Sequence, residues 1–258
     1  LPELEQWALH RLYEMDQEIR THIRDYDFGK LAHKLHNFCS SELSALYFDV
    51  RKDRLYCDRP DQFERRACRT VLAEIFECLT SWLAPMLCFT CEDVWAHRPA
   101  GMFKGEDSVH LRNFKALPSA WKNDALAEKW TKLRAIRRVV LGALEPKRAD
   151  KTIGSSLEAN PHIYLASDLA SAVEGVDLAE LCITSQVQLH VGADAPADAF
   201  KLNDVAGVGV SFAKAEGQKC QRCWKILPDV GTDKDYPDLS ARDADAVRWY
   251  VEQKQKAA

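Results

Sequence analysis

The sequence predicts a mainly α protein, in which an antiparallel helix bundle is followed by a small α+β domain and a turn-rich C-terminal module. Apolar residues recur every three or four positions through the first 145 residues, which is the period of an amphipathic helix. A stretch near residue 185 alternates apolar and polar residues, as a half-buried strand does. From residue 217 onward, Asp, Gly and Pro surround a C-x-x-C motif, which indicates turns.

The helical part contains clear start and stop signals. Asp27 and Asp61 are expected to cap the second and third helices, because a carboxylate accepts hydrogen bonds from the first free N–H groups of a helix. Pro85 interrupts the third helix, since proline lacks a backbone N–H. The expected helices run over about 4–24, 28–50, 61–84, 85–97 and 121–144.

The sequence changes character after Pro146. Short β-prone segments appear there, separated by segments of helical character. Strands are expected over 163–165, 183–191 and 208–212, and short helices over 168–173 and 177–182. We therefore expect three domains: a helical bundle over 1–150, a small α+β junction domain over 151–216, and a zinc-knuckle-like module with an incomplete ligand set over 217–258. The last module is expected to end in a helix from about Arg242.

Composition excludes several classes of protein. The 258 residues carry a net charge of -4, which excludes a uniformly basic coat for DNA or RNA. No apolar run approaches the ~20 residues of a membrane span. The nine cysteines are scattered and odd in number, unlike a secreted disulfide framework, so we expect a cytoplasmic protein without a membrane partner. A chain that starts at Leu1 inside a helical pattern is expected to be a piece of a longer protein.

The strongest local motif is the C-x-x-C of Cys220 and Cys223. Two thiolates at this spacing can share one metal ion, but a structural zinc site needs four ligands. The residues that follow contain no Cys or His, so the sequence disfavours zinc, and no other cofactor is expected. A metal-free turn with two thiols, and a metal-sensing or redox protein, both stay open. The second C-x-x-C, Cys88 and Cys91, lies in an apolar helical stretch and is interpreted as core.

A basic segment runs from Lys129 to Lys151. It holds eight cations and two carboxylates, a net +6 within an acidic chain. Helical spacing places Arg134, Arg137 and Arg138 on one face, and such a ridge can bind phosphates. The alternative is a solvated helix face.

Trp224 follows the C-x-x-C turn and is flanked by Arg222 and Lys225. An aromatic ring beside cations can stack an unpaired base while the cations hold phosphates. The alternative is a hydrophobic plug for a module with few apolar side chains. The sequence carries no phosphate-binding glycine loop, no H-E-x-x-H and no G-x-S-x-G motif, so no catalytic residue is predicted.

Several segments share the motifs of one family. They are WALHRL at 7–12, YDF at 26–28, YFDVRKDRLY at 47–56, LAPMLCFTCEDVW at 83–95 and KTIGSSLEA at 151–159. Together they resemble the helical anticodon-binding domain of class I aminoacyl-tRNA synthetases. The tail, with CQRCW at 220–224 and YPDL at 236–239, resembles the C-terminal module of the bacterial isoleucyl-tRNA synthetases.

The sequence departs from this family in two ways. The HIGH and KMSKS signatures and the editing domain are absent, so the chain alone is expected to be non-catalytic, and ATP and magnesium would act only in the full-length ligase. The family's tail usually holds a second C-x-x-C that completes a zinc site. Ser240 and Asp243 stand at those positions here, which puts zinc in doubt.

The resemblance implies recognition of the anticodon stem-loop of isoleucine tRNA, with the catalytic domain of the same polypeptide as the second partner. By this resemblance Trp224 is the expected stacking platform and Arg222 a base or phosphate contact, with Lys225 beside them. Expected backbone contacts, on position alone, are Arg134, Arg137, Arg138, Arg148 and Lys151. The alternatives are the equivalent region of a valyl- or leucyl-tRNA synthetase and a stand-alone RNA-binding module.

Overall fold

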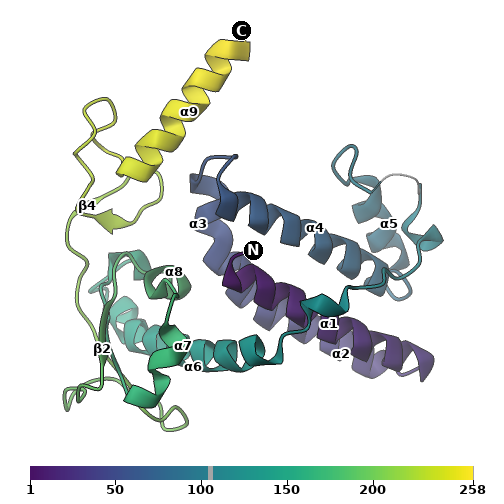
Figure 1. Ribbon diagram of the computed structural model, residues 1–258, viewed down its shortest axis with the longest axis horizontal. Helices are drawn as coiled ribbons and strands as arrows, with labels where there is room; N and C mark the ends of the chain where they lie inside the picture. The colour runs from purple at the N-terminus through teal and green to yellow at the C-terminus, as the bar shows by residue number, and fades with distance from the viewer. Residues whose placement is uncertain (104–106, 258) are drawn as a thin grey trace. The chain divides into compact units, whose positions relative to one another are not determined.

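The structure is a computed structural model that describes residues 1–103 and 107–257. It is mainly α, as predicted, with two small sheets. Its contacts divide the chain into two compact units. The first comprises Leu1–Asp49 and Asp61–Asp124, and the second comprises Val50–Pro60 and Ala125–Ala258. Figure 1 shows the helices and strands of both units along the chain.

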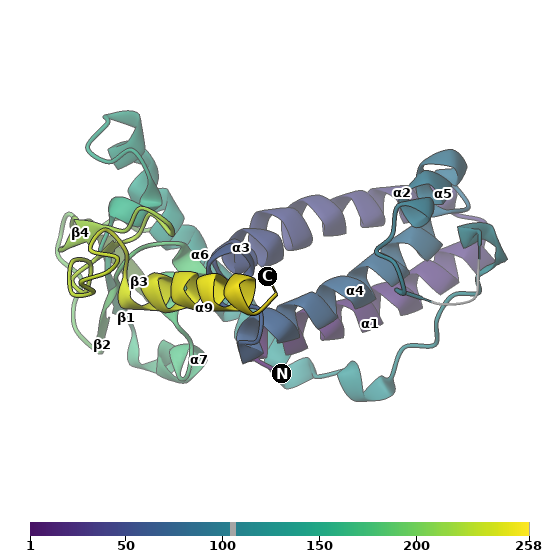
Figure 2. The same cartoon turned by 90° about the horizontal axis from the view of Figure 1, so that it is seen from above.

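Helices build the first unit. Figure 2 shows α1 and α4 running alongside one another, and α1 also contacts α2. The apolar stripe predicted for the first helix is buried, with Leu12 and Ile19 fully inaccessible, and Leu31 of α2 and Val71 of α4 are equally buried. The helices are α1 (Glu3–Arg24), α2 (Phe28–Asn37), α4 (Phe63–Leu83) and α5 (Cys88–Ala96), with short 3-10 turns η2 (Val109–Leu111) and η3 (Ser119–Trp121).

Of the two predicted capping residues, Asp27 is confirmed and Asp61 is not. The side chain of Asp27 accepts a hydrogen bond from the Lys30 N–H at 3.2 Å and so caps α2. For Asp61 the predicted capping position is wrong, because α4 begins at Phe63 and its N-cap residue is Gln62, whose side chain makes no cap bond. A carboxylate two residues before the first helical residue lies outside the capping position.

The second helix is longer than predicted. α2 passes without a break into a π-helical segment, η1 (Phe38–Phe48), and then into α3 (Asp49–Cys57). The break expected near Val50 is absent because the residues from 51 to 57 contain no helix breaker before Pro60. The additional helical turns carry the chain from the first unit into the second, because Val50–Pro60 belongs to the second unit.

The long helix of the second unit is α6 (Asp124–Ala149), which continues past Pro146. Proline removes one N–H from the helix. The final turn is held by the carbonyl of Pro146, which accepts from the Asp150 N–H at 2.9 Å, and that of Lys147, which accepts from the Ile153 N–H at 3.1 Å.

Three strands form the main sheet of this unit in the order β2-β1-β3. β1 (His162–Leu165) is parallel to β2 (Gln188–Val191) and antiparallel to β3 (Val208–Ser211). Ile163 lies opposite Leu189 on one side and Val210 on the other. Ile163 and Leu165 are buried, which confirms the predicted strand at 163–165.

The strand predicted over 183–191 is shorter than expected. Ile183 has φ +55° and closes α8 (Leu178–Cys182) as a left-handed cap, so pairing with β1 begins at Gln188. The two short helices are confirmed as α7 (Ala170–Val173) and α8.

The C-terminal module contains a two-stranded hairpin and a helix. β4 (Gln218–Lys219) pairs antiparallel with β5 (Ile226–Leu227), and α9 (Ala241–Ala257) follows. In the described part of the chain, no helix has the length and apolar character needed to cross a membrane.

Candidate nucleic-acid interface

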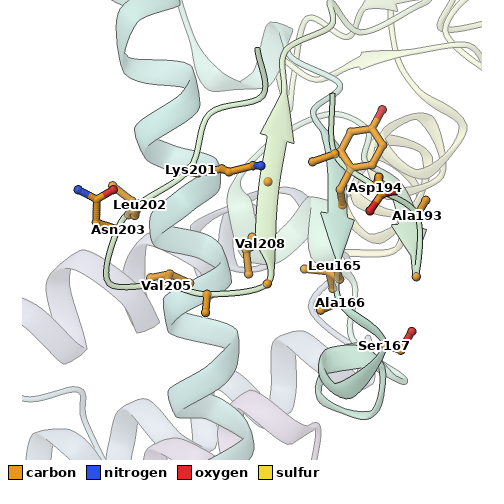
Figure 3. A pocket seen from close by; sticks show the side chains of 16 residues that line it. Leu165, Ala166, Ser167, Ala193, Asp194, Lys201, Leu202, Asn203, Val205 and Val208 are labelled. Atoms are coloured by element: carbon orange, nitrogen blue, oxygen red, sulfur yellow. The ribbon is translucent and has the colours of Figure 1, made fainter. Parts of the chain in front are cut away.

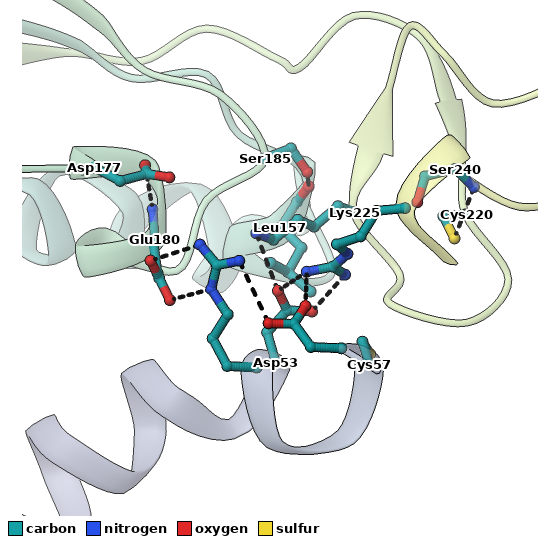
Figure 4. Close-up of polar contacts among 12 residues, drawn as sticks. Asp53, Cys57, Leu157, Asp177, Glu180, Ser185, Cys220, Lys225 and Ser240 are labelled. Carbon is teal, nitrogen blue, oxygen red and sulfur yellow. Dashed lines mark hydrogen bonds and ion pairs between the residues drawn. The ribbon is translucent and has the colours of Figure 1, made fainter. Parts of the chain in front are cut away.

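The C-x-x-C turn brings two buried thiols to the start of α9. The turn is closed by two backbone bonds, from the Trp224 N–H to the Cys220 carbonyl at 3.0 Å and from the Cys220 N–H to the Lys225 carbonyl at 2.9 Å. The Cys220 thiol donates to Asp243 Oδ2 at 3.2 Å. The Ser240 hydroxyl donates to the same oxygen at 2.8 Å, and its N–H donates to Cys220 Sγ at 3.3 Å (Figure 4).

Two guanidinium groups contact the carboxylate of Asp243. Arg222 Nη1 lies 2.6 Å from Oδ1, and Arg242 Nη2 lies 3.4 Å from Oδ2. Asp243 is fully buried. Burial opposes its ionisation, but hydrogen bonding from Cys223 and the charge of Arg242 outweigh burial and lower its pKa. The carboxylate is therefore charged and satisfied on both oxygens.

These residues do not fit a four-ligand zinc site. The sulfur atoms of Cys220 and Cys223 and one oxygen of Asp243 lie within 4.8 Å of one another. Closed structural zinc sites use four ligands, nearly always Cys or His, and the fourth position here holds the neutral hydroxyl of Ser240. Burial, and then Asp243, raise the pKa of the Cys223 thiol.

The side chains that flank Trp224 point toward α3. Arg222 Nη1 donates to the carbonyl of Cys57, and its Nη2 donates to the carbonyl of Tyr56 at 3.0 Å. Lys225 Nζ lies 3.4 Å from Asp53 Oδ2, and its side chain is only 18% exposed (Figure 4). The hydrogen bonds of Arg222 and the ion pair of Lys225 therefore attach the module to α3.

α3 also binds α8. Arg54 makes a two-pronged contact with Glu180, with Nε–Oε1 at 2.9 Å and Nη2–Oε2 at 3.2 Å, and Arg51 Nη1 lies 2.8 Å from Oε1. Burial raises the pKa of Glu180, but the two guanidinium groups outweigh it and lower that pKa. Figure 4 shows the carboxylates of Glu180 and Asp53 joined by dashed lines to guanidinium groups.

Trp224 is the exposed residue of the tail motif. Its side chain is 63% exposed, and its backbone has φ +64°, a left-handed conformation that is unfavourable for a residue with a Cβ. Packing does not explain this conformation, because the ring lies largely outside the core. The alternative of a buried plug therefore does not fit this geometry.

The basic face of α6 is divided. Arg137 is half-buried, and its Nε donates to the Leu181 carbonyl at 2.9 Å. Arg134 and Arg138 are exposed and line a hollow of about 320 Å³. Arg148 and Lys151 are exposed and line a second hollow of about 530 Å³. Of the predicted ridge, Arg134 and Arg138 are exposed, while Arg137 binds the Leu181 carbonyl of α8. Arg148 and Lys151 form a second exposed pair.

A cavity of about 510 Å³ lies at the carboxyl ends of the parallel strands β1 and β2 (Figure 3). This edge of a parallel pair commonly binds ligands, and the volume falls within the range of ligand pockets. Among the described residues that line the cavity, the exposed Lys201 and Asp194 carry opposite charges. The cavity therefore lacks the positive charge that the hollows along α6 provide.

A second group with metal-ligating side chains lies in the first unit. It consists of His10, Glu14 and Asp124. His10 Nδ1 accepts the Asn123 N–H at 2.9 Å, so its proton is on Nε2, which faces Glu14 Oε2 at 3.2 Å. A metal would need the lone pair of Nε2. This cluster therefore joins α1 to residues 123 and 124 within the first unit.

Sequence reasoning missed Asp53 and Arg242, which organise the site without belonging to any chemical motif. Asp53 falls inside the 47–56 segment that carries the family resemblance, and Arg242 adjoins Asp243. Their positions within or next to recognised motifs could have marked both residues as candidates. Nothing in the sequence indicates that the two residues pair with one another.

Two family models match this chain. The family model described as the anticodon-binding domain of tRNA ligase matches residues 5–163, and the model for a zinc finger found in FPG and IleRS matches residues 217–246. The chain therefore belongs to the anticodon-binding domain family of tRNA ligases.

The curated relatives that this chain resembles are isoleucine–tRNA ligases. The chain is 52% identical over 249 residues to an isoleucine–tRNA ligase of Agrobacterium fabrum and 50% identical over 249 residues to that of Brucella abortus. It is 48% identical over 250 residues to that of Caulobacter vibrioides. Each alignment covers 96% of this chain and 25% of the relative, so the chain spans about a quarter of the length of these proteins.

Proposed function

We propose that this chain recognises the anticodon stem-loop of isoleucine tRNA as part of an isoleucine–tRNA ligase. The observation that supports this most directly is similarity to such ligases over 96% of the chain. In this proposal the ATP- and magnesium-dependent chemistry belongs to a catalytic domain of the same cytoplasmic polypeptide. In this proposal residues 1–150 are assigned to the anticodon-binding bundle, 151–216 to the junction domain and 217–258 to the terminal module. These divisions follow the sequence motifs and differ from the two compact units.

In this proposal Trp224 stacks on an unpaired base. Recognition of single-stranded RNA depends on aromatic side chains that receive splayed bases, and the exposed ring of Trp224 is available for this contact. Arg222 and Lys225 are not assigned to RNA, because their side chains bind α3 and Asp243.

Exposed cations of α6 and the residues after it supply the phosphate contacts. Arg138 pairs with Asp204 and Arg148 with Glu145, and all four of these side chains are more than half exposed. Exposed ion pairs contribute little stability, so a phosphate can take the place of the carboxylate. Such contacts position the RNA without specifying its sequence.

The test is binding of the chain to isoleucine, valine and leucine tRNAs, and to isoleucine tRNA with one anticodon base changed at a time. We expect isoleucine tRNA to bind most tightly and a change at a stacked or hydrogen-bonded base to cost about 1–3 kcal/mol. Equal affinity for all three tRNAs would contradict the proposed specificity. Equal affinity for every anticodon variant would move the contact away from the anticodon.

A further inference from the structure

The terminal module closes its core without the ligands of a four-cysteine zinc site. Cys220 and Asp243 are completely buried. The cluster around them contains Cys57, Cys220, Cys223, Val230, Leu239 and Ala244. A small module with few apolar residues ordinarily needs a metal or a disulfide at its centre, and all the cysteines of this cluster are free thiols.

We infer that this module folds and keeps its shape without zinc, with the guanidinium of Arg222 and the carboxylate of Asp243 forming the link that a metal ion makes in related fingers. The family match describes a zinc finger, so this chain departs from its family at that point.

The contacts of Arg222 explain how a side chain can replace the ion. One guanidinium joins three segments: the C-x-x-C turn from which it extends, the start of α9 through Asp243 at 2.6 Å, and the end of α3 through the carbonyls of Tyr56 and Cys57. The last carbonyls of a helix lack partners within the helix and carry partial negative charge. A planar cation with several donors can satisfy them together with a carboxylate.

The charges of the cluster support the same conclusion. A zinc ion would balance the negative charge of its ligands. Here the charge of Asp243 is balanced by Arg222 at 2.6 Å, with Arg242, whose shorter contacts are with Asp53, a further 3.4 Å contact. Ser240 adds a hydrogen bond rather than charge. A divalent cation placed beside these guanidinium groups would meet like charges in a buried site.

The first test measures zinc in the purified chain. After growth with added zinc sulfate and desalting, we expect far less than one zinc ion per chain by mass spectrometry, and a urea midpoint that neither a strong chelator nor added zinc changes. One zinc ion per chain, together with a midpoint that falls on chelation, would overturn the inference.

A pair of substitutions tests whether Ser240 and Asp243 cause the difference. Ser240→Cys combined with Asp243→Cys should restore four thiolates, bind about one zinc ion per chain and become sensitive to chelator. A folded double variant that binds no zinc would contradict the assignment of these two positions.

A third measurement tests Arg222 directly and leaves the ligand positions unchanged. With chelator present, Arg222→Gln should speed hydrogen exchange of the amides at 220–224 and 240–243 by about a hundredfold, because it leaves Asp243 buried with less positive charge nearby. Added zinc should not restore protection. Arg248→Gln is the matched control, since Arg248 is another arginine of the terminal module that pairs with an aspartate, but it lies on α9 and contacts Asp233 near the surface. Wild-type exchange rates in Arg222→Gln would overturn the inference.

Discussion

Arg242 and Asp53 form a two-pronged ion pair between residues 189 positions apart in the chain. Nη1 lies 2.6 Å from Oδ2 and Nη2 lies 3.0 Å from Oδ1. The side chains are 27% and 20% exposed. This planar geometry is the strongest arrangement available to arginine and a carboxylate. Because Asp53 lies on α3 and Arg242 on α9, the pair fastens the terminal module to α3.

Asp53→Asn should destabilise the chain by about 2 kcal/mol near neutral pH, because it removes the charge partner of Arg242 and Lys225 from a largely buried site. Urea unfolding measures the change. Glu145→Gln is the control, since it breaks an exposed pair with Arg148 and should cost less than about 0.5 kcal/mol. Equal costs for the two variants would show that the Asp53 pair contributes no more than a surface pair.

The contribution of Asp53 should also depend on pH. Burial raises the pKa of this carboxyl, but hydrogen bonding and charge from Arg242 outweigh burial and lower it to about 2, from an ordinary 3.8. A carboxyl whose pKa is lower in the folded state stabilises the fold above its unfolded pKa, and the effect disappears as pH falls through the folded pKa.

The stability difference between wild type and Asp53→Asn should therefore be complete at about pH 6, roughly halved at about pH 3 and nearly absent at about pH 2. Urea unfolding of both proteins over this range measures it. A difference that stays constant from pH 6 to pH 3 would contradict the assignment to ionisation of Asp53.

The sequence predicted the parts of this molecule that depend on local pattern. The helical periods identified the buried faces that contain Leu12 and Leu31, and the β-prone run identified β1. The pattern failed at Ile183, where a β-branched residue adopts a left-handed cap that alternation does not reveal. The direction of Arg222 could not be predicted either, because its partners lie on α3, more than 160 residues away in sequence.

Trp224→Gly should separate stability from RNA binding. Glycine adopts φ +64° without steric cost, so the variant should be as stable as wild type or more stable by up to about 1 kcal/mol. If Trp224 stacks on a base, the same variant should bind tRNA more weakly by about 1–3 kcal/mol. Thermal unfolding and tRNA titration give the two values.

Trp224→Tyr is the control for this experiment, because it keeps an aromatic face and should retain most of the affinity. Unchanged affinity of the glycine variant would remove Trp224 from the interface. A large loss of stability would show instead that the ring packs against the module.

Arg137 and Arg138 are adjacent but should behave differently. Arg138→Ala should reduce the salt dependence of tRNA binding by about one ion and change stability by less than about 0.5 kcal/mol, since Arg138 forms an exposed pair with Asp204. Arg137→Ala should leave the salt dependence unchanged and cost about 1 kcal/mol of stability, because the Leu181 carbonyl loses its donor. Reversed effects would place Arg137 in the interface.

The start of the hairpin in the terminal module requires glycine at Gly217 for two reasons. Its φ is +122°, and a Cβ there would lie 2.4 Å from the backbone carbonyl of Leu227 and 2.7 Å from the nitrogen of Pro228. Gly231 shares the first reason only, because its φ is +95° but a Cβ would meet nothing closer than 3.8 Å.

Gly231→Ala should therefore cost about 1 kcal/mol from backbone strain alone. Gly217→Ala should cost at least about 2 kcal/mol more, because the β4–β5 pair must separate to make room. Urea unfolding of both variants measures the difference, and equal losses would show that the hairpin accommodates the methyl group without opening.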